Sequence, residues 1–383
     1  MKQVVVLGCG LVGRLIAKDL ASDASLSVTV ADRDERALKS LGSDEKLRTI
    51  VSDLSDVSAL AKLLSGFGLA VGSLPGFLGL QTLRTVIETG IDYADISFMP
   101  EDPLDLHELA VKRGVTAIVD CGVAPGMSNL IAGHAAATME RLDRILIVVG
   151  GLPTVRQWPF EYKAVFSPID VIEEYTRPAR YVEYGRTVEQ PALSDVELID
   201  LPGVGTLEAF NTDGLRSLAR TLTAPHMKEK TLRYPGHAER MRMLRDAGFF
   251  GYDPIQLKDA EIRPIDLTAR LLFQMWKMQP SDRDLTVMRV VVEGAERGRR
   301  VRHTWDLLER FDEASGASAM SRTTGFPCAI AARMLARGDI AEKGVLPPEI
   351  LGKHEALFQG FMGGLAQRGV RFTQTVEELA DRA

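Results

Sequence analysis

Three glycines near the start of the chain have the spacing of a dinucleotide-binding turn. Gly8, Gly10 and Gly13 follow a short apolar run and open an amphipathic helical pattern that begins with Leu11 and Val12. In such a turn the first glycine permits the tight bend, the second lets the backbone approach a pyrophosphate, and the third lets helix and strand pack closely. The free N–H groups of the first helical turn then bind the phosphates. The pattern predicts a cofactor that carries a diphosphate.

An acidic residue follows the glycines at the distance that the same fingerprint requires, about 20 residues. Asp32 ends the second apolar run, and its carboxylate would accept hydrogen bonds from the adenosine ribose while repelling a 2′-phosphate, which favours NAD over NADP. Arg33 weakens this preference, because a guanidinium pairs with phosphate or stacks on adenine. In the alternative interpretation the glycines mark an ordinary turn and Asp32 caps a helix over 35–41.

Two further loops are expected at the same edge of the sheet. Asp53 and Leu54 follow the third expected strand, and Leu74 and Pro75 follow the fourth. Ligands of doubly wound sheets bind outside the carboxyl ends of the strands. Both loops are therefore predicted to contact the cofactor, unless they serve only as connections.

The elements that position these residues alternate between strands and helices. Apolar runs predict strands, and amphipathic patterns predict helices that end at Gly90 and Gly114 in two cases. This alternation is typical of a parallel Rossmann-type sheet with helices on both faces. The expected strands are 3–7, 27–31, 47–51, 69–72 and 115–119, and the expected helices are 11–20, 35–41, 57–64, 78–88 and 104–113.

The pattern changes in the second half of the chain. Long β-rich runs separated by turn signals predict a second, α+β domain with a mainly antiparallel sheet. The expected runs are 144–149, 181–188, 286–293 and 300–306, the last two joined by a hairpin loop at 294–299. A helix is expected over 328–335, with Pro327 near its first turn, and the tail predicts a helix over 355–365 and a strand over 370–372.

Composition narrows the class of function. The 383 residues suffice for two domains, and 46 Lys and Arg against 52 Asp and Glu give a net charge of -6, which offers no basic field for nucleic acid or anionic lipid. Cys9, Cys121 and Cys328 lack the spacing of a metal site or disulfide framework. No run resembles a signal peptide or membrane span. We expect a cytoplasmic protein that acts on a small molecule without a metal.

Several blocks outside the fingerprint resemble the saccharopine dehydrogenase-like family. They occur in order along most of the chain, and three of them, GGLP, RPA and TLRYPGH, are most similar to the L-lysine 6-dehydrogenase branch. The blocks are DCGVAPGMSNLIAGH at 120–134, GGLP at 150–153, SPIDVIEEYTRPA at 167–179, NTDGLRSL at 211–218, KTLRYPGH at 230–237 and TTGFPCAIAARML at 323–335.

This resemblance implies a fold, an assembly and a reaction. It implies an NAD-binding Rossmann domain at 1–121, a substrate and dimerisation domain at 122–322, a C-terminal helical segment at 323–383 that returns to the Rossmann domain, and a homodimer. It also implies oxidative deamination of the terminal amine of L-lysine, which gives an aminoadipate semialdehyde that closes to a cyclic imine. Cys9 departs from the usual alanine of the glycine loop, where a small thiol also fits.

Removal of a hydride from the carbon next to nitrogen requires a neutral amine. We therefore expect a general base that takes a proton from the ammonium form of the substrate. His237 is one candidate, because an imidazole titrates near neutral pH. Asp95, expected near the carboxyl edge of the first sheet, is another and would hold a substrate ammonium. A capping or surface histidine and a solvated carboxylate are the alternatives.

An amino-acid substrate also needs a cation for its carboxylate. Arg233 and Arg177 are the candidates, because a guanidinium binds a carboxylate at two points, although each may instead form a surface ion pair. Tyr234, within the block over 230–237, and Gly122, within the block over 120–134, are also expected to bind the substrate. Asn129 is expected to orient the substrate or nicotinamide, or to cap a helix, and Thr324 opens a helix whose N-terminus would face an anion.

The sequence thus predicts an NAD-dependent oxidoreductase similar to lysine 6-dehydrogenase, with NADP less favoured. The nearest rival is a saccharopine or carboxynorspermidine dehydrogenase that works in the reductive direction. A rival of another class is a non-catalytic NAD-binding sensor or scaffold, since a fold alone does not establish chemistry.

Overall fold

The computed structural model describes residues 1–42, 46–165 and 168–380. Ser167, where the third of the resembling blocks begins, lies outside these residues. The chain forms two compact units, Met1–Thr138 with Ser321–Arg371 (unit 1) and Met139–Met320 with Phe372–Ala383 (unit 2). Among the described residues, no helix is both long and apolar enough to cross a bilayer.

Unit 1 contains a seven-stranded sheet in which every neighbouring pair is parallel, in the order β17-β6-β5-β4-β1-β2-β3. The six strands β1 to β6 follow the Rossmann order, and β17 extends one edge. Continuous apolar runs form the central strands because both faces of such a sheet are buried. The strands are β1 (Lys2–Leu7), β2 (Leu26–Asp32), β3 (Leu47–Val51), β4 (Leu69–Gly72), β5 (Asp92–Asp95), β6 (Thr116–Ile118) and β17 (Gly344–Leu346).

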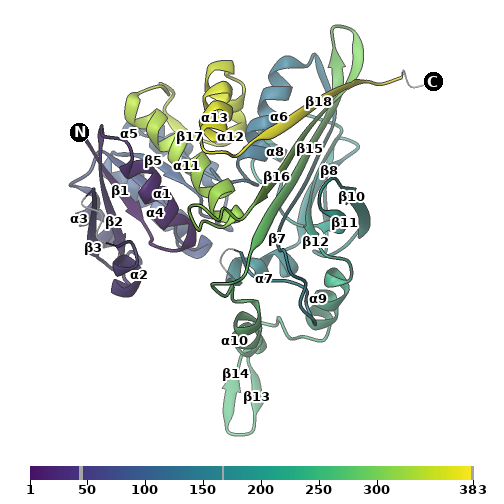
Figure 1. Cartoon of the computed structure of the whole chain (residues 1–383), viewed down its shortest axis with the longest axis horizontal. Helices are drawn as coiled ribbons and strands as arrows, with labels where there is room; N and C mark the ends of the chain where they lie inside the picture. Colours follow the sequence, from purple (N-terminus) through teal and green to yellow (C-terminus); the bar gives the residue numbers. More distant parts are fainter. Residues whose placement is uncertain (43–45, 166–167, 381–383) are drawn as a thin grey trace. The chain divides into compact units, whose positions relative to one another are not determined.

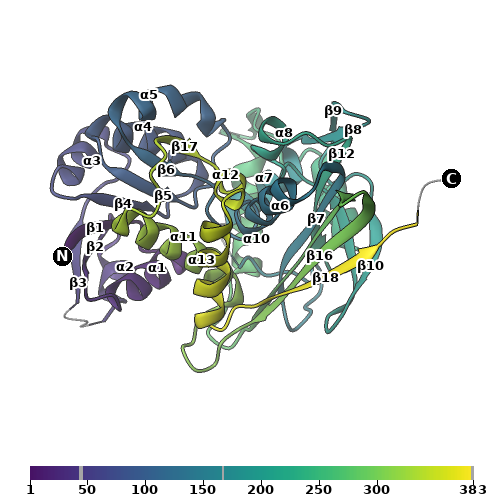
Figure 2. The same cartoon turned by 90° about the horizontal axis from the view of Figure 1, so that it is seen from above.

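Helices cover both faces of this sheet, which confirms the predicted fold class (Figure 2). The figure shows α3, α4 and α5 on one side of the strands, with α1, α2 and α11 on the other. Gly90 and Gly114 end their helices in the left-handed conformation, as predicted. The elements are α1 (Leu11–Ala21), α2 (Glu35–Lys39), α3 (Val57–Leu64), α4 (Gly79–Thr89), α5 (His107–Arg113) and the 3-10 turns η1 (Gly76–Leu78) and η2 (Pro103–Leu106).

The C-terminal return adds α11 (Ala319–Arg337), α12 (Pro348–Gly352) and α13 (Glu355–Gln367). The predicted start of α11 was wrong, because the helix begins at Ala319 and Pro327 lies inside it. The Asp284 carboxylate accepts hydrogen bonds from the N–H groups of Ala319 (2.8 Å) and Met320 (2.9 Å). Because the capping residue is distant in the sequence, no pattern near Ala319 indicates that a helix begins there.

Unit 2 is built on a nine-stranded sheet in the order β10-β11-β12-β7-β15-β16-β18, with β8 paired to β12 and β9 paired to β8 (Figure 1). Among the described strand pairs of this sheet, only β7 and β12 are parallel, so the sheet is mainly antiparallel as predicted. The strands are β7 (Arg141–Pro153), β8 (Ala179–Glu183), β9 (Arg186–Gln190), β10 (Glu197–Leu201), β11 (Gly205–Asn211), β12 (His226–Arg233), β15 (Asp284–Glu296), β16 (Arg299–Arg310) and β18 (Phe372–Glu378).

Apolar side chains pack against both faces of the unit 2 sheet. One core cluster joins the sheet to three helices and contains Tyr175 and Trp276, and the other contains Leu232 and Tyr234. The remaining elements are α7 (Pro168–Thr176), α8 (Leu218–Thr221), α9 (His237–Asp246), α10 (Pro264–Trp276) and a separate hairpin of β13 (Ile255–Leu257) and β14 (Ala260–Ile262).

Some strand predictions differ from the structure. The tail strand expected over 370–372 is β18, which runs from Phe372 to Glu378. The run over 181–188 is a hairpin of β8 and β9, because Tyr184 and Gly185 both have positive φ and reverse the chain. The strand β5 was not predicted. The hairpin predicted at 294–299 is confirmed, with its turn at Arg297 and Gly298, where positive φ at both positions suits a tight two-residue turn.

The compact units also divide the chain differently from the domains expected at 1–121, 122–322 and 323–383. Residues 122–138 include α6 (Met127–Thr138), which packs on α12 within unit 1. Gly133 and Gly352 permit this close approach, since a Cβ at either would collide with the opposite backbone. Strand β18 joins unit 2 because it pairs with β16.

Candidate functional site

The three glycines of the first βα turn occupy three different environments. Gly8 has φ +103°, and a Cβ there would collide with the backbone carbonyl of Ser73. A Cβ at Gly13 would collide with the carbonyl of Gly8. A Cβ at Gly10 would meet no atom within 4 Å, and the backbone of Gly10 is extended (φ -73°, ψ -166°). Gly8 and Gly13 therefore serve the fold, and Gly10 keeps open the space above the first turn of α1.

Asp32 is tied to this turn by its carboxylate. Its Oδ2 accepts a hydrogen bond from the N–H of Cys9 (2.6 Å), and its Oδ1 accepts one from the N–H of Asp34 (2.8 Å). The helix cap is Asp34 and not Asp32, because Asp34 accepts from the N–H of Arg36 at the start of α2. The capping alternative for Asp32 is therefore excluded. Its carboxylate stands at the carboxyl end of β2, beside the glycine turn.

The two predicted loops meet the same edge of the sheet. The N–H of Ser73 donates to Leu7 at the end of β1 (2.9 Å), and Leu74 would lie 3.3 Å from a Cβ at Gly8. Pro75 precedes η1. Leu54 is buried in the core, so only its backbone can face a ligand.

Asp53 and Arg33 lie at the exposed rim of this edge. The hydroxyl and N–H of Ser55 donate to the Asp53 carboxylate and lower its pKa, and the nearby charge of Arg33 adds to the effect. The structure thus gathers the predicted cofactor residues, Leu11 and Val12 of α1 included, at one edge of one sheet.

Asp95 is the last residue of β5 and is fully buried. Its Oδ1 accepts from the N–H (3.1 Å) and hydroxyl (2.8 Å) of Ser97, and the neighbouring Tyr93 hydroxyl acts with Ser97 to lower the pKa of the carboxyl, while Oδ2 has no geometric hydrogen-bond partner among the described residues. Burial raises the pKa of Asp95 to about 6. Gly72 makes room for this cluster, because a Cβ there would collide with both side chains.

Asn129, Gly122 and Thr324 lie in unit 1. A Cβ at Gly122 would be 3.3 Å from Cγ2 of Thr324, and the next residue of α11, Gly325, packs against Val12 of α1. These contacts place Thr324 near the glycine turn. The prediction that Thr324 opens a helix was wrong, because Thr324 lies inside α11, which begins at Ala319. Asn129 is fully buried, and its side chain accepts from the hydroxyl of Ser128 (3.0 Å) and donates to Glu349 (3.3 Å). Asn129 thus links α6 to α12 within unit 1.

Arg233 is buried in unit 2, with each nitrogen of its guanidinium engaged. Nε donates to the hydroxyl of Tyr175 (3.2 Å), one terminal nitrogen donates to the carbonyl of Leu232 (2.9 Å), and the other pairs with Glu174 (2.8 Å). The guanidinium also lies 4.6 Å from the ring centre of Tyr162. The predicted carboxylate clamp is therefore occupied by partners within the protein, with Arg233 only 2% exposed.

His237 continues the same network. Its Nε2 lies 2.9 Å from the hydroxyl of Tyr175, and its Nδ1 lies 2.9 Å from the carbonyl of Phe160. Because Tyr175 accepts from Arg233, we assign its proton to the bond toward Nε2 and place the imidazole proton on Nδ1. Burial and the charge of Arg233 lower the pKa of His237 to about 3. A neutral ring with both nitrogens bonded is not arranged to accept a substrate proton.

The other two predicted substrate residues also have partners within unit 2. Arg177 pairs with Glu173 one helical turn earlier. Tyr234 follows Arg233 on the opposite face of the sheet, where its hydroxyl donates to the carbonyl of Pro153 (2.8 Å) and its ring joins the second core cluster.

Sequence reasoning missed the residues that organise this network. Tyr175 and Glu174 lie in the resembling block over 167–179, and Glu208 caps α9 by accepting from the N–H groups of Gly236 (2.8 Å) and Ala238. Taken singly, these residue types do not indicate a buried network. The Glu-Glu-Tyr run inside the resembling block over 167–179 is the one signal that could have pointed to Glu174 and Tyr175. No set of His, Cys, Asp and Glu suited to holding a metal occurs in the described part of the chain.

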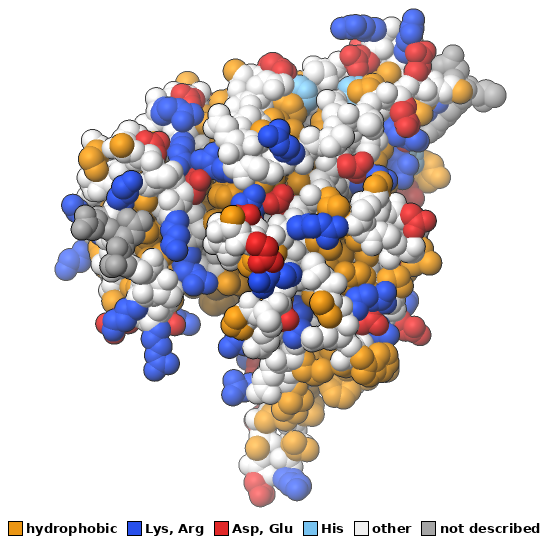
Figure 3. All heavy atoms as spheres, in the orientation of Figure 1, with side chains coloured by type: hydrophobic (Ala, Val, Ile, Leu, Met, Phe, Trp, Pro, Cys, Tyr) orange, Lys and Arg blue, Asp and Glu red, His pale blue; other side chains and the backbone are white. Residues whose placement is uncertain are grey.

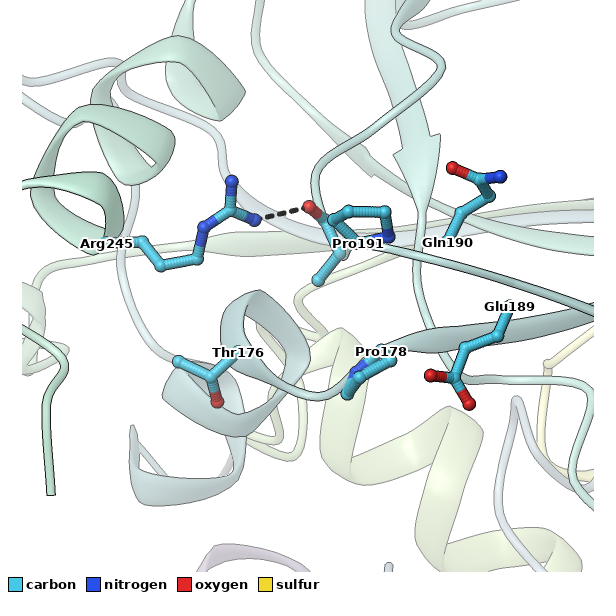
Figure 4. Close-up of a pocket in the computed structure, with 7 residues that line it drawn as sticks. Thr176, Pro178, Glu189, Gln190, Pro191 and Arg245 are labelled. Atoms are coloured by element: carbon cyan, nitrogen blue, oxygen red, sulfur yellow. Dashed lines mark hydrogen bonds between the residues drawn. The ribbon is translucent and has the colours of Figure 1, made fainter.

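A pocket of about 280 Å³ lies elsewhere in unit 2 (Figure 4). Arg245 points across it and donates to the carbonyl of Ala192 (2.6 Å). None of the predicted site residues lines this pocket, so it is not part of the candidate site. The lining residues are Thr176, Pro178, Glu189, Gln190, Pro191, Ala192 and Arg245.

The parallel sheet, the open Gly10 and the acid at the end of β2 define a dinucleotide-binding protein of the Rossmann class. The chain belongs to the saccharopine dehydrogenase family: residues 4–118 match the saccharopine dehydrogenase NADP binding domain, and residues 122–370 match the saccharopine dehydrogenase C-terminal domain. The predicted resemblance is confirmed at the level of the family, and the protein is by class a nucleotide-dependent dehydrogenase.

Proteins similar to this chain match it at low sequence identity. The chain is 23% identical to the L-glutamate-forming, NADP(+) saccharopine dehydrogenase of Saccharomyces cerevisiae over 91% of this chain and 94% of that protein. It is 24% identical to carboxyaminopropylagmatine dehydrogenase of Synechocystis, with 91% and 92% covered. It is 23% identical to the mitochondrial alpha-aminoadipic semialdehyde synthase of Bos taurus, but spans only 45% of that protein. The solved apo structure of the yeast enzyme matches with a TM-score of 0.81 at 21% identity over 98% of this chain and 100% of that one.

Proposed function

We propose that the protein is an NAD-dependent dehydrogenase that oxidises the terminal amine of L-lysine or of a related amino acid. The observation that carries the proposal is the open backbone at Gly10 beside a fixed Asp32 carboxylate, in a chain of the saccharopine dehydrogenase family. The resemblance of three blocks to the lysine 6-dehydrogenase branch supports the choice of amine.

The residues at the edge of the unit 1 sheet fit a dinucleotide. The N–H groups at the start of α1 would bind its diphosphate, and Asp32 would accept hydrogen bonds from its ribose. When bound, NAD supplies a hydride acceptor. The protein must then supply a neutral amine, because the nitrogen lone pair assists departure of the hydride.

Asp95 is the better of the two predicted proton acceptors. Its pKa of about 6 lies closer to neutral pH than that of His237, and its Oδ2 has no hydrogen-bond partner among the described residues. Burial makes this carboxylate costly to ionise, which is typical of groups that exchange protons. We propose that Asp95 takes the proton of the substrate ammonium, and we assign His237 to positioning within its own network.

Asp95→Asn is predicted to raise stability and lower turnover together. The pKa of Asp95 is raised in the folded state. The protonated carboxyl therefore makes its full contribution to the free energy of unfolding below pH 3.8, and this contribution is lost as the pH rises to about 6. Above pH 6 the buried charge costs about 3 kcal/mol. Urea unfolding should therefore show a gain for the variant at pH 7 that disappears near pH 4. Equal stability at pH 7, or wild-type turnover, would contradict this role.

Asp32 is proposed to set a preference for NAD, although the matching family domain is named for NADP. Asp32→Asn keeps an oxygen for the N–H of Cys9 but removes the charge that repels a 2′-phosphate. We expect the ratio of the NAD and NADP dissociation constants to shift toward NADP by about tenfold, or ~1.4 kcal/mol. Asp34→Asn, which removes an equal charge two residues away, is the matched control. An unchanged ratio for Asp32→Asn would refute the preference.

The rival within the family is a saccharopine or carboxynorspermidine dehydrogenase acting in the reductive direction. This alternative is supported by the similarity of the chain to the Synechocystis protein named carboxyaminopropylagmatine dehydrogenase. Initial rates of nicotinamide reduction or oxidation with L-lysine, saccharopine and polyamine precursors, each with NAD and NADP, separate the candidates. Turnover of L-lysine with NAD supports the proposal, and turnover of a secondary amine alone supports the rival.

A non-catalytic NAD sensor remains the alternative of another class. Such a protein would bind NAD and turn over none of these amines. The same rate measurements therefore distinguish it, provided that nucleotide binding is measured on the same preparation.

A further inference from the structure

Glu229 is a buried acid within the sheet of unit 2. It lies on β12 and is only 5% exposed. The charged side chains on the face of the molecule in Figure 3 are of both signs and lie at the surface, where water solvates them. Glu229 lacks most of this solvation. Acidic residues are almost never fully buried unless they are paired, so the partners of this carboxyl decide what it can do.

The carboxyl of Glu229 has one hydrogen-bonded neighbour in the described part of the chain. The hydroxyl of Thr212 lies 2.7 Å from its Oε2, and the same hydroxyl lies 2.8 Å from the hydroxyl of Thr231 on β12. Gly214 packs against the carboxyl, because a Cβ there would collide with it. Among the described residues, no cation forms an ion pair with Glu229 and no donor reaches its Oε1.

The charges near Glu229 do not balance. Glu174 and Asp213 are close enough to raise its pKa, and Arg233 is close enough to lower it. Arg233, however, is paired with Glu174 (2.8 Å), and Asp213 is paired with Arg180 (2.6 Å). Each of these two arginines therefore neutralises another acid. When all three acids are ionised, the group lacks one positive charge.

Without that positive charge, the carboxyl of Glu229 is mostly protonated at neutral pH. Burial is the main cause, and together with the two neighbouring acids it raises the pKa of Glu229 to about 8. The hydroxyls suit this state as well, because the protonated carboxyl can donate to Thr212 while Thr212 donates to Thr231. A cation that reached the carboxyl would favour its charged form, so the proton would pass to solvent and an ion pair would form.

An ammonium that takes no part in the reaction is the cation that fits this site. The reacting amine must lose its charge, whereas a second ammonium keeps its charge and its three N–H donors throughout. A carboxylate and two hydroxyls offer acceptors to those donors.

We propose that Glu229, with the hydroxyls of Thr212 and Thr231, binds the non-reacting ammonium of the substrate, which in L-lysine is the α-ammonium. This assignment rests on the proposed oxidation of a terminal amine. It makes Glu229 the residue that selects a substrate with a second positive charge over a simple amine.

Calorimetric titration of the full chain at pH 7, in buffers of different ionisation enthalpy, measures both affinity and proton release. NADH is present throughout, so that no hydride is transferred. The two ligands are L-lysine and 6-aminohexanoate, which keeps the reacting amine and the carboxylate but lacks the α-ammonium. The wild type should bind L-lysine at least about tenfold more tightly. Binding of L-lysine should also release about one more proton, because Glu229 ionises only beside the second ammonium.

Glu229→Gln keeps the size of the side chain and its bond to Thr212 but cannot ionise. We expect about tenfold weaker binding of L-lysine, unchanged binding of 6-aminohexanoate and loss of the extra proton release. Glu189→Gln, at an exposed glutamate of β9, is the matched control and should behave like the wild type. Thermal unfolding of Glu229→Gln should occur at a temperature no lower than that of the wild type, because the variant removes a buried ionisable group.

Equal affinity of the wild type and Glu229→Gln for L-lysine would overturn the ammonium site. An equal loss of affinity for both ligands would also overturn it, because that result indicates a structural effect. Failure of the proposed function is recognised separately. If L-lysine binds as predicted but reduces no NAD when NAD replaces NADH, the proposed oxidation is wrong and the ammonium site is supported. If the wild type does not prefer L-lysine to 6-aminohexanoate, the ammonium site is wrong, whatever the turnover with NAD.

Discussion

Gly10→Val should abolish measurable dinucleotide binding and leave the fold intact. The backbone of Gly10 is extended and a Cβ there meets nothing within 4 Å, so a branched side chain is accommodated in the free protein. The same side chain fills the space that a pyrophosphate needs above α1. We expect the dissociation constant for NAD to rise at least 100-fold, about 3 kcal/mol. Calorimetric titration measures the affinity, and thermal unfolding should shift little.

The other two glycines supply the matched controls. Gly13→Ala places a Cβ against the carbonyl of Gly8, and Gly8→Ala imposes a side chain on a positive φ as well as on the carbonyl of Ser73. Both should lower the free energy of unfolding by about 1–3 kcal/mol. If Gly10→Val binds NAD normally, or if it unfolds like the controls, the division of roles among the glycines is wrong.

Arg233→Met should destabilise the protein by about 3–5 kcal/mol, because it removes one member of a buried charged network. The change leaves the Glu174 carboxylate without its guanidinium and breaks the bond that orients Tyr175 toward His237. Urea unfolding at neutral pH measures the loss. Arg299→Met removes an exposed arginine that pairs with Glu378 and should cost less than about 1 kcal/mol.

The sequence had suggested a different role for Arg233, as the clamp for a substrate carboxylate. That role predicts a raised KM for the amino acid with unchanged stability. Wild-type stability for Arg233→Met, together with a large rise in KM, would therefore restore the clamp. A stability loss of the expected size for Arg233→Met, with a smaller loss for Tyr175→Phe, would support a structural role for Arg233 in the buried network.

The nucleotide edge was predictable because its signals are local. A glycine spacing, the acid that follows and the ends of apolar strands all act within one βαβ unit, and the structure places Gly8, Gly10, Gly13 and Asp32 together as expected. Strand β5 escaped prediction because half of its Asp-Tyr-Ala-Asp sequence is acidic. Its aspartates are tolerated there through contacts that no single-residue preference describes, such as the bond from the N–H of Thr116 to Asp92.

The substrate residues were predicted less well because their environments depend on distant parts of the chain. His237 and Arg233 look reactive as residue types, yet Tyr175, which lies about 60 residues earlier, binds both of them. The start of α11 has the same explanation, since Asp284 supplies its cap. Partners so remote in sequence are fixed by tertiary packing, which one sequence without a structure does not reveal.

The most direct test of the account is a calorimetric titration of the purified wild-type protein with NAD and with NADP, followed by addition of L-lysine to the complex. We predict binding of one dinucleotide per chain, tighter for NAD, and reduction of the bound nicotinamide once the amine is present. Absence of heat with either dinucleotide would contradict the site at the glycine turn, and binding without reduction by any amine would contradict the proposed activity.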